Sequence, residues 1–145
     1  MKKFVAVMVV AFVAAFSVSI CSAYDQNHYP NDPYDYNSNY MYIFEAMGRT
    51  KYYLDLNSVD VQEYNPPHDQ IAGQMVSYSD YYDKTNEPIY VVIRYNWYTK
   101  ESFHLNDYGY WVKDEIDGNY NAVIHRRKTV DALFRAAYNM DFYGY

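Results

Sequence analysis

Hydrophobic and polar positions alternate with a period of two through the middle of the chain. The alternation is clearest in residues 89–98, where one set of alternate positions is wholly apolar or aromatic: Ile89, Val91, Ile93, Tyr95 and Trp97. Successive side chains of a strand point to opposite faces, so this stretch predicts a β-strand whose apolar face lies in the core. The same pattern, in weaker form, predicts strands at 41–47, 51–56, 59–64, 70–82, 102–105 and 108–113.

The period changes near the C-terminus. Val130, Leu133, Phe134 and Ala137 recur at intervals of three and four residues, which predicts an amphipathic helix. Its start is left open within residues 121–129. A series of strands followed by one helix predicts an α+β fold: a mostly antiparallel sheet of five to seven strands, with one C-terminal α-helix packed on it.

The N-terminus does not follow this pattern. Lys2 and Lys3 precede an unbroken apolar run at 4–16, and small residues follow near position 23. This order is typical of a secretory signal peptide, and the run is shorter than the roughly 20 residues that a membrane-spanning helix needs. We therefore expect residues 1–23 to be a signal peptide and the mature chain to have no transmembrane segment. Cys21 leaves lipidation open as an alternative.

Residues 24–40 have a composition of their own. Tyr, Asn, Asp and Pro dominate this stretch, which contains no Val, Ile or Leu. Such a segment has little apolar surface to bury, so we expect a flexible arm rather than part of the core. The remaining residues, 41–145, are expected to form a single globular domain, which suits their number.

Charge and cysteine content narrow the functional classes. Loss of Lys2 and Lys3 with the signal peptide would change the formal net charge from −6 to −8. An acidic chain lacks the basic footprint of a nucleic-acid-binding protein. Cys21 is the only cysteine, so the mature chain would form no disulfide and offer no thiolate. We expect a periplasmic, cell-surface or secreted protein that does not bind nucleic acid.

Patterns for catalysis or metal binding do not emerge. The four histidines lie far apart and lack metal-ligand spacing: His28, His68, His104 and His125. The acidic groups near positions 32–35, 80–83 and 114–117 are interpreted as solvated loop carboxylates. Glu45 sits in an apolar strand, where burial would raise its pKa, but an edge position or a basic partner is the favoured interpretation.

From these absences we expect no enzymatic activity, no metal and no cofactor. Two alternatives stay open. One is an envelope hydrolase that uses a pair of carboxylates on either side of a cleft. The other is an enzyme inhibitor, in which an exposed loop such as residues 65–69 plugs the cleft of its target.

Tyrosine is the outlier of the composition, with 21 residues, none of them before position 24. Tyr combines an apolar ring with a polar tip, which suits both half-exposed strands and surfaces that contact partners. In the predicted strand 89–98, the face opposite the apolar one carries Tyr90, Arg94, Asn96 and Tyr98. We expect these four residues to be the ligand-binding surface, in contact with an envelope or extracellular protein or glycan.

A short motif adds a resemblance to a known family. Tyr53, Asp55, Ser58 and Val59 fit an aromatic–aliphatic–Asp–x–x–Ser–aliphatic signature. On this motif the chain resembles, over about residues 42–98, small exported bacterial proteins of the surface-adhesin protein E type. The resemblance implies a surface or periplasmic domain without known catalysis, and it provides no ligand residue. We therefore expect a bacterial cell-envelope binding or structural module.

Overall fold

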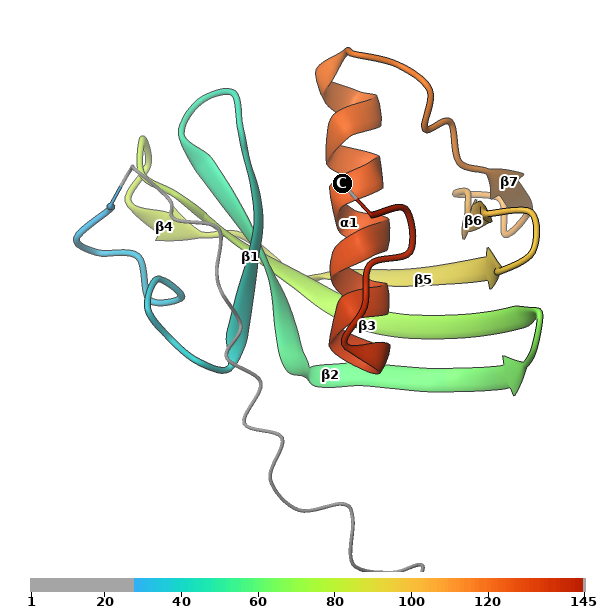
Figure 1. Ribbon diagram of the computed structural model, residues 1–145. Coiled ribbons are helices and arrows are strands. Elements are labelled where there is room, and N and C mark those ends of the chain that lie inside the picture. The colour runs from blue at the N-terminus through green and yellow to red at the C-terminus, as the bar shows by residue number, and fades with distance from the viewer. Residues whose placement is uncertain (1–27, 145) are drawn as a thin grey trace, which may run out of the picture.

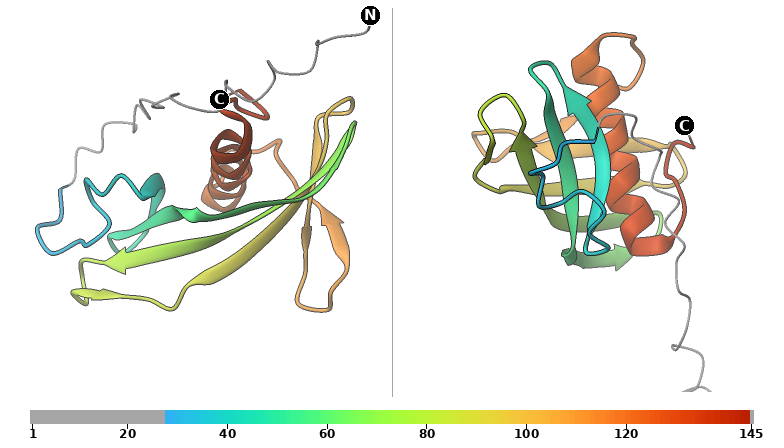
Figure 2. Two further views of the ribbon diagram at one scale, coloured as in Figure 1. Left: turned by 90° about the horizontal axis from the view of Figure 1, so that it is seen from below. Right: turned by 90° about the vertical axis from the view of Figure 1, so that its left-hand side faces the viewer.

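The computed structural model describes residues 28–144, so the predicted signal peptide lies outside the described residues. The chain forms two layers, a curved antiparallel sheet and one helix that lies across the concave side of the sheet (Figures 1 and 2). The predicted α+β fold with a single C-terminal helix is confirmed. No helix in the described part of the chain has the length and apolar character to cross a membrane.

The sheet has seven strands, the upper limit of the predicted number, and every neighbouring pair is antiparallel. Its strands are β1 (Tyr40–Ala46), β2 (Thr50–Asn65), β3 (His68–Ser79), β4 (Lys84–Thr85), β5 (Ile89–Asn96), β6 (Glu101–Leu105) and β7 (Trp111–Lys113). The order across the sheet is β1-β2-β3-β5-β6-β7, and the short β4 pairs with β3 beyond the end of β5. Sequential hairpins thus build almost the whole sheet.

The sequence predicts two separate strands at 51–56 and 59–64, whereas the structure has one continuous strand, β2, over both ranges. The register with β3 shifts between Asp55 and Asp60, so the intervening residues form an irregularity within a continuous strand. The Ser58 hydroxyl donates to the Asp55 carbonyl at 2.6 Å and accepts the Gln74 backbone N–H at 2.7 Å. This side chain supplies hydrogen bonds that the interrupted ladder lacks, which is why the strand continues past a sequence typical of a turn.

The helix α1 (Asn121–Tyr138) begins at the early end of the interval that the sequence left open. Val130, Leu133 and Phe134 of its apolar face are buried against the sheet, where the core includes Ile93 and Tyr95 of β5. The Tyr95 hydroxyl is buried and donates to the Val130 carbonyl at 2.9 Å. The apolar face predicted for β5 is therefore the helix-facing side at Ile93 and Tyr95, whereas Ile89, at the start of the strand, is 51% exposed rather than in the core.

The two faces of β3 have different neighbours. Gly73 lies under α1, where a Cβ atom would come within 2.9 Å of Leu133 Cδ1, so the absence of a side chain lets the helix approach closely. Because side chains alternate along a strand, Gln70 and Tyr78 point to the side away from the helix. We call this side of the sheet the outer face.

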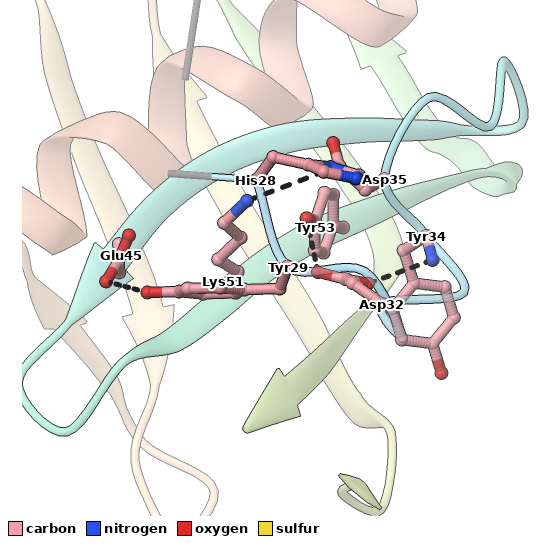
Figure 3. Close-up of polar contacts among 8 residues, drawn as sticks. All are labelled: His28, Tyr29, Asp32, Tyr34, Asp35, Glu45, Lys51 and Tyr53. Carbon is pink, nitrogen blue, oxygen red and sulfur yellow. Dashed lines mark hydrogen bonds and ion pairs between the residues drawn. The ribbon is translucent and has the colours of Figure 1, made fainter. Parts of the chain in front are cut away.

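Part of the predicted arm lies on the outer face. Residues 28–36, which we call the docked segment, cover β1 and β2, and Tyr29 is only 4% exposed (Figure 3). Asp32 is also buried and accepts a hydrogen bond from the Tyr53 hydroxyl at 2.7 Å. The segment packs without aliphatic residues because tyrosine rings and paired polar groups take their place. Flexibility of residues 24–27 stays a prediction outside the described residues.

Candidate functional site

Two of the four residues predicted to bind a ligand lie together on the outer face. Tyr90 is 59% exposed and Arg94 is exposed on the same side of β5. Their positions on this strand are four residues apart, which corresponds to a separation of roughly 13 Å along it. Neither side chain is covered by the helix or by the docked segment, so both are available to a partner.

A chain of side-chain hydrogen bonds joins these two residues across three strands. Arg94 Nε donates to Gln70 Oε1 at 2.9 Å, and Gln70 Nε2 donates to Gln62 Oε1 at 2.7 Å. Gln62 Nε2 then donates to the Tyr90 hydroxyl oxygen at 3.0 Å. The Arg94 guanidinium also lies over the Trp111 ring, 4.1 Å from its centroid. We call Gln62, Gln70, Tyr90, Arg94 and Trp111 the polar strip.

The register between neighbouring strands determines which side chains of the strip lie next to one another. Gln70 lies directly opposite Arg94 in the β3–β5 ladder. A register shift between Val61 and Glu63 brings Gln62 toward the same row. Sequence reasoning missed Gln62, Gln70 and Trp111, since the order and register of β2, β3 and β7 relative to β5 are not visible from local pattern. Their common signal is a polar or aromatic residue on the outer face of its own strand.

The other two predicted residues lie where β5 turns into β6. Asn96 Oδ1 accepts the backbone N–H groups of Tyr98 at 3.1 Å and Thr99 at 3.3 Å. Asn96 therefore holds the turn, as Asn commonly does. Tyr98 is 84% exposed at the tip. The structure does not join these two residues to the hydrogen-bond chain, and their part in binding stays a prediction.

The docked segment encloses a second polar cluster at the opposite end of the outer face (Figure 3). The Tyr29 hydroxyl donates to Glu45 Oε1 at 2.6 Å, and Glu45 lies on the edge strand β1, as expected from its sequence. Burial, followed by this bond, raises the pKa of Tyr29, because both disfavour the phenolate. A second hydrogen bond between a tyrosine hydroxyl and a carboxylate, from Tyr53 to Asp32, lies deeper in the cluster.

Lys51 is the cation of this cluster and is fully buried, with 0% exposure. Its Nζ atom lies 4.5 Å from the centroid of the Tyr29 ring and 3.8 Å from Asp35 Oδ2. The same carboxylate oxygen is 2.8 Å from His28 Nδ1. A lysine in the middle of an outer strand face is thus enclosed by an aromatic ring and a carboxylate, which offset part of the cost of burying its charge.

A third cluster surrounds Asp114, beneath the helix. This residue is buried rather than solvated, contrary to the interpretation of its acidic loop. Ser102 Oγ donates to Asp114 Oδ2 at 2.5 Å, and His104 Nδ1 lies 2.6 Å from Asp114 Oδ1. Arg126 Nε is 3.5 Å from the same oxygen and links the loop to α1. These partners explain why the carboxylate tolerates burial.

Beside Asp114 the surface is hollowed by a pocket of about 560 Å³. Its acidic lining residues are Glu101, Asp114, Glu115 and Asp117, and its basic lining residues are Lys100 and Lys113. Lys113 Nζ lies 2.5 Å from Glu101 Oε1, and this contact lowers the pKa of Glu101. A lowered pKa keeps this carboxylate ionised at neutral pH, which disfavours a role as general acid and also makes it a weaker general base.

Asp69 is a buried carboxylate near the β2–β3 turn. Its Oδ2 atom accepts the Trp97 indole N–H at 3.0 Å and the Tyr138 hydroxyl at 2.8 Å, whereas Oδ1 has no hydrogen-bond partner among the described residues. The proposed inhibitory loop at 65–69 is the tight connection between these two long strands, and Asp69 anchors its end within the domain.

Histidines and acids do not gather into a metal site in the part of the chain that the structure describes. His125 stacks on the Phe44 ring, with 4.1 Å between ring centroids, and thereby helps to attach the helix to β1. His28 and His104 each face one carboxylate. These three histidines therefore have contacts within the protein itself.

Comparison of the chain with protein-family models, with curated proteins and with solved structures gave no match. The resemblance to the surface-adhesin protein E type therefore stays a prediction. Functional inference rests on the geometry of the three polar clusters.

Proposed function

We propose that the chain is an exported, non-catalytic binding module of the bacterial cell envelope, and that it contacts an envelope or extracellular protein or glycan through the polar strip. The observation that supports this proposal is the hydrogen-bonded row from Arg94 to Tyr90 on an uncovered sheet face. Side chains held in one geometry before binding lose less conformational entropy when a ligand arrives.

The chemistry of the strip also suits recognition. Tyr90 offers an exposed ring and a hydroxyl, and Arg94 offers a charged planar group. Tyrosine, tryptophan and arginine are enriched among the residues that dominate binding energies. The strip belongs to the rigid strands β2, β3, β5 and β7, so it does not depend on a mobile loop.

The test is capture of partners by protein purified from cells that express the full chain. Immobilised protein is expected to retain an envelope protein or glycan at micromolar load, and Arg94→Ala is expected to abolish retention. Tyr108→Ala is the control, because Tyr108 is 84% exposed but lies outside the strip. Failure of the unmodified protein to retain any protein or glycan would contradict the proposal.

Export is tested on the same preparation. Signal-peptide cleavage predicts that the purified protein begins at Tyr24, whereas lipidation predicts an N-terminus at a modified Cys21. The mass of the intact protein distinguishes these outcomes. An unprocessed chain recovered from the cytoplasm would contradict the proposed location.

A hydrolase that uses two carboxylates is a second candidate, favoured by the acid-lined pocket beside Asp114. Its test is the release of soluble products from envelope polysaccharide. If Glu101 takes part in the reaction, Glu101→Gln is expected to lower the rate by about a hundredfold or more. A complete absence of products with the unmodified protein would contradict this candidate.

A further inference from the structure

We infer that the ligand of the polar strip is a glycan that carries carboxylates, of the uronic-acid type, and that a carboxylate of this glycan docks on Arg94. This inference rests on the proposed function and names its ligand class. The direction of the hydrogen bonds, the unfilled donors of the strip and the contrasting chemistry of the docked segment support it.

Arg94 fixes the direction of the hydrogen-bond chain. Its Nε carries a hydrogen at all accessible pH values, so the Gln70 atom that it meets has to be the amide oxygen. The Gln70 nitrogen then has to donate to Gln62, and the Gln62 nitrogen has to donate to Tyr90. Every bond therefore runs from Arg94 toward Tyr90, and the Tyr90 oxygen receives the last one.

This direction leaves the strip rich in donors. The terminal guanidinium N–H groups, the second N–H of each amide and the hydroxyl proton of Tyr90 all remain for a ligand. No salt bridge joins Arg94 to an acid in the part of the chain that the structure describes. The Trp111 ring covers one face of the guanidinium and keeps its edge accessible. A planar, positively charged fork is the geometry that binds carboxylates in a bidentate manner.

The other end of the same sheet face shows the complementary arrangement. There, two donors on the sheet meet carboxylates of the docked segment, because Tyr53 meets Asp32 and Lys51 meets Asp35. A third pair runs the other way, from the Tyr29 hydroxyl of the docked segment to Glu45 on β1. The docked segment contributes Asp32 and Asp35, whereas Tyr90 and Arg94 of the polar strip stay exposed within the part of the chain that the structure describes. A bound ligand that brings carboxylates would complete the strip as the docked segment completes its own region.

Position on the sheet favours a glycan over a peptide. Extended peptides usually bind by adding a strand to a free sheet edge through main-chain hydrogen bonds. Gln70 and Arg94 instead lie where β3 and β5 pair with strands on both sides, whereas Gln62 and Tyr90 lie where β2 and β5 pair with β3 alone. A ligand that docks on Arg94 is therefore recognised by side chains, and sugar hydroxyls match the neighbouring amide N–H groups while a sugar ring stacks on the exposed Tyr90 ring.

The net charge of the chain further narrows the class of glycan that suits the strip. The formal charge of −6, or −8 after cleavage, opposes the approach of a densely charged polymer. One cation in the strip suits a ligand whose carboxylates are spaced along a mostly uncharged saccharide. Nucleic acid, with a phosphate at each nucleotide, does not fit this description.

The test compares three probes by titration calorimetry. The probes are a uronic-acid oligosaccharide, the same oligosaccharide with its carboxylates reduced to alcohols, and an oligoglutamate of matched charge. The purified protein is expected to bind the first probe at least about tenfold more tightly than either of the others, a difference of about 1.4 kcal/mol.

Variants of the strip locate the contact. Gln70→Glu would place a carboxylate of the protein beside Arg94 and is expected to lower affinity for the acidic oligosaccharide by at least tenfold. Asn119→Asp adds the same charge on an exposed loop outside the strip and is the control. Arg94→Lys keeps the positive charge without the planar fork, so it is expected to restore part of the affinity that Arg94→Ala loses.

Each outcome has a distinct meaning. Equal affinity for the acidic and the reduced oligosaccharide would overturn carboxylate recognition while leaving the proposed binding function intact. Tighter binding of oligoglutamate would replace the glycan with an acidic peptide. Binding that is unaffected by Gln70→Glu and Arg94→Ala would move the site away from the strip. If none of the probes binds, the inference fails, and retention of another partner by the immobilised protein would still support the proposed function.

Discussion

Two regions of one sheet face use similar residues to opposite effect. The covered region, beneath the docked segment, buries Lys51 and Tyr53 with the carboxylates Asp32 and Asp35. The polar strip exposes a cation and a tyrosine, and no carboxylate among residues 28–144 forms a salt bridge with the cation. On this face the buried tyrosines and the buried cation have acidic partners, whereas the exposed Tyr90 and Arg94 have neutral amide partners instead.

The largest expected contrast is between the two cations. Lys51→Ala removes a fully buried side chain and leaves its polar neighbours enclosed, so we expect a loss of about 3 kcal/mol or more in the free energy of unfolding. Arg94→Ala removes an exposed side chain and is expected to cost less than about 1 kcal/mol. Urea denaturation of both variants measures the contrast. Equal losses would show that the strip is part of the folded framework.

Removal of an acid from the covered region is expected to have the next largest effect. Asp32→Ala takes the carboxylate acceptor from the buried Tyr53 hydroxyl, which costs about 2 kcal/mol for a hydrogen bond to a charged group. The matched control is Asp107→Ala, at an exposed turn between β6 and β7, expected to change stability by less than about 0.5 kcal/mol. If Asp32→Ala unfolds at the same urea concentration as the unmodified protein, the docked segment contributes nothing to stability.

Alkaline pH is expected to weaken the fold near the covered region. The hydroxyl of Tyr78, which is buried, donates to Asp83, and this bond raises the pKa of Tyr78 from 10.0 to about 12. The folded chain therefore holds this proton more tightly than the unfolded chain. Its contribution to stability is complete below pH 10 and is lost as pH rises through about 12.

The measurement is the free energy of unfolding as a function of pH, in the unmodified protein and in Tyr78→Phe. The variant is expected to show a shallower decline between pH 10 and pH 12, because its residue 78 does not ionise. Coincident slopes would contradict the role assigned to this hydroxyl. At neutral pH the variant loses only the hydrogen bond to Asp83, a smaller effect than that of Asp32→Ala.

Local periodicity was sufficient to predict the architecture. The alternation in residues 89–98 identified Ile93 and Tyr95 as core residues, and the intervals around Leu133 identified the helix, because both patterns lie within single elements. The same reasoning predicted a free arm, since it counted aliphatic side chains. Tyr29 is nevertheless buried, because its ring covers Lys51 and its hydroxyl has an acceptor.

The candidate site could be predicted only in part, for a different reason. Tyr90 and Arg94 share a face of one strand, so the alternation found both. Gln70 is 24 positions from Arg94 in sequence and meets it only through the β3–β5 register. The register between strands depends on hairpin turns and on bulges such as the one near Gln62. The sequence pattern within a single strand does not specify which residues of neighbouring strands pair.

The smallest expected effect most sharply distinguishes the two regions. Gln70→Glu replaces a neutral partner of Arg94 with a carboxylate, directly opposite on the neighbouring strand. A cross-strand pair of opposite charges on an exposed face is worth about 0.2–1 kcal/mol, so this variant is expected to be slightly more stable than the unmodified protein at low salt. Gln74→Glu adds the same charge between Tyr90 on β5 and Asp55 on β2, where it meets a like charge and no cation in the ladder, and is expected to be slightly destabilising. A gain for Gln70→Glu that disappears in high salt would show that the strip lacks a carboxylate in the free protein. This would distinguish the strip from the covered region, which already contains carboxylates. A loss of stability would show instead that the amide chain itself, rather than the missing charge, is what this surface requires.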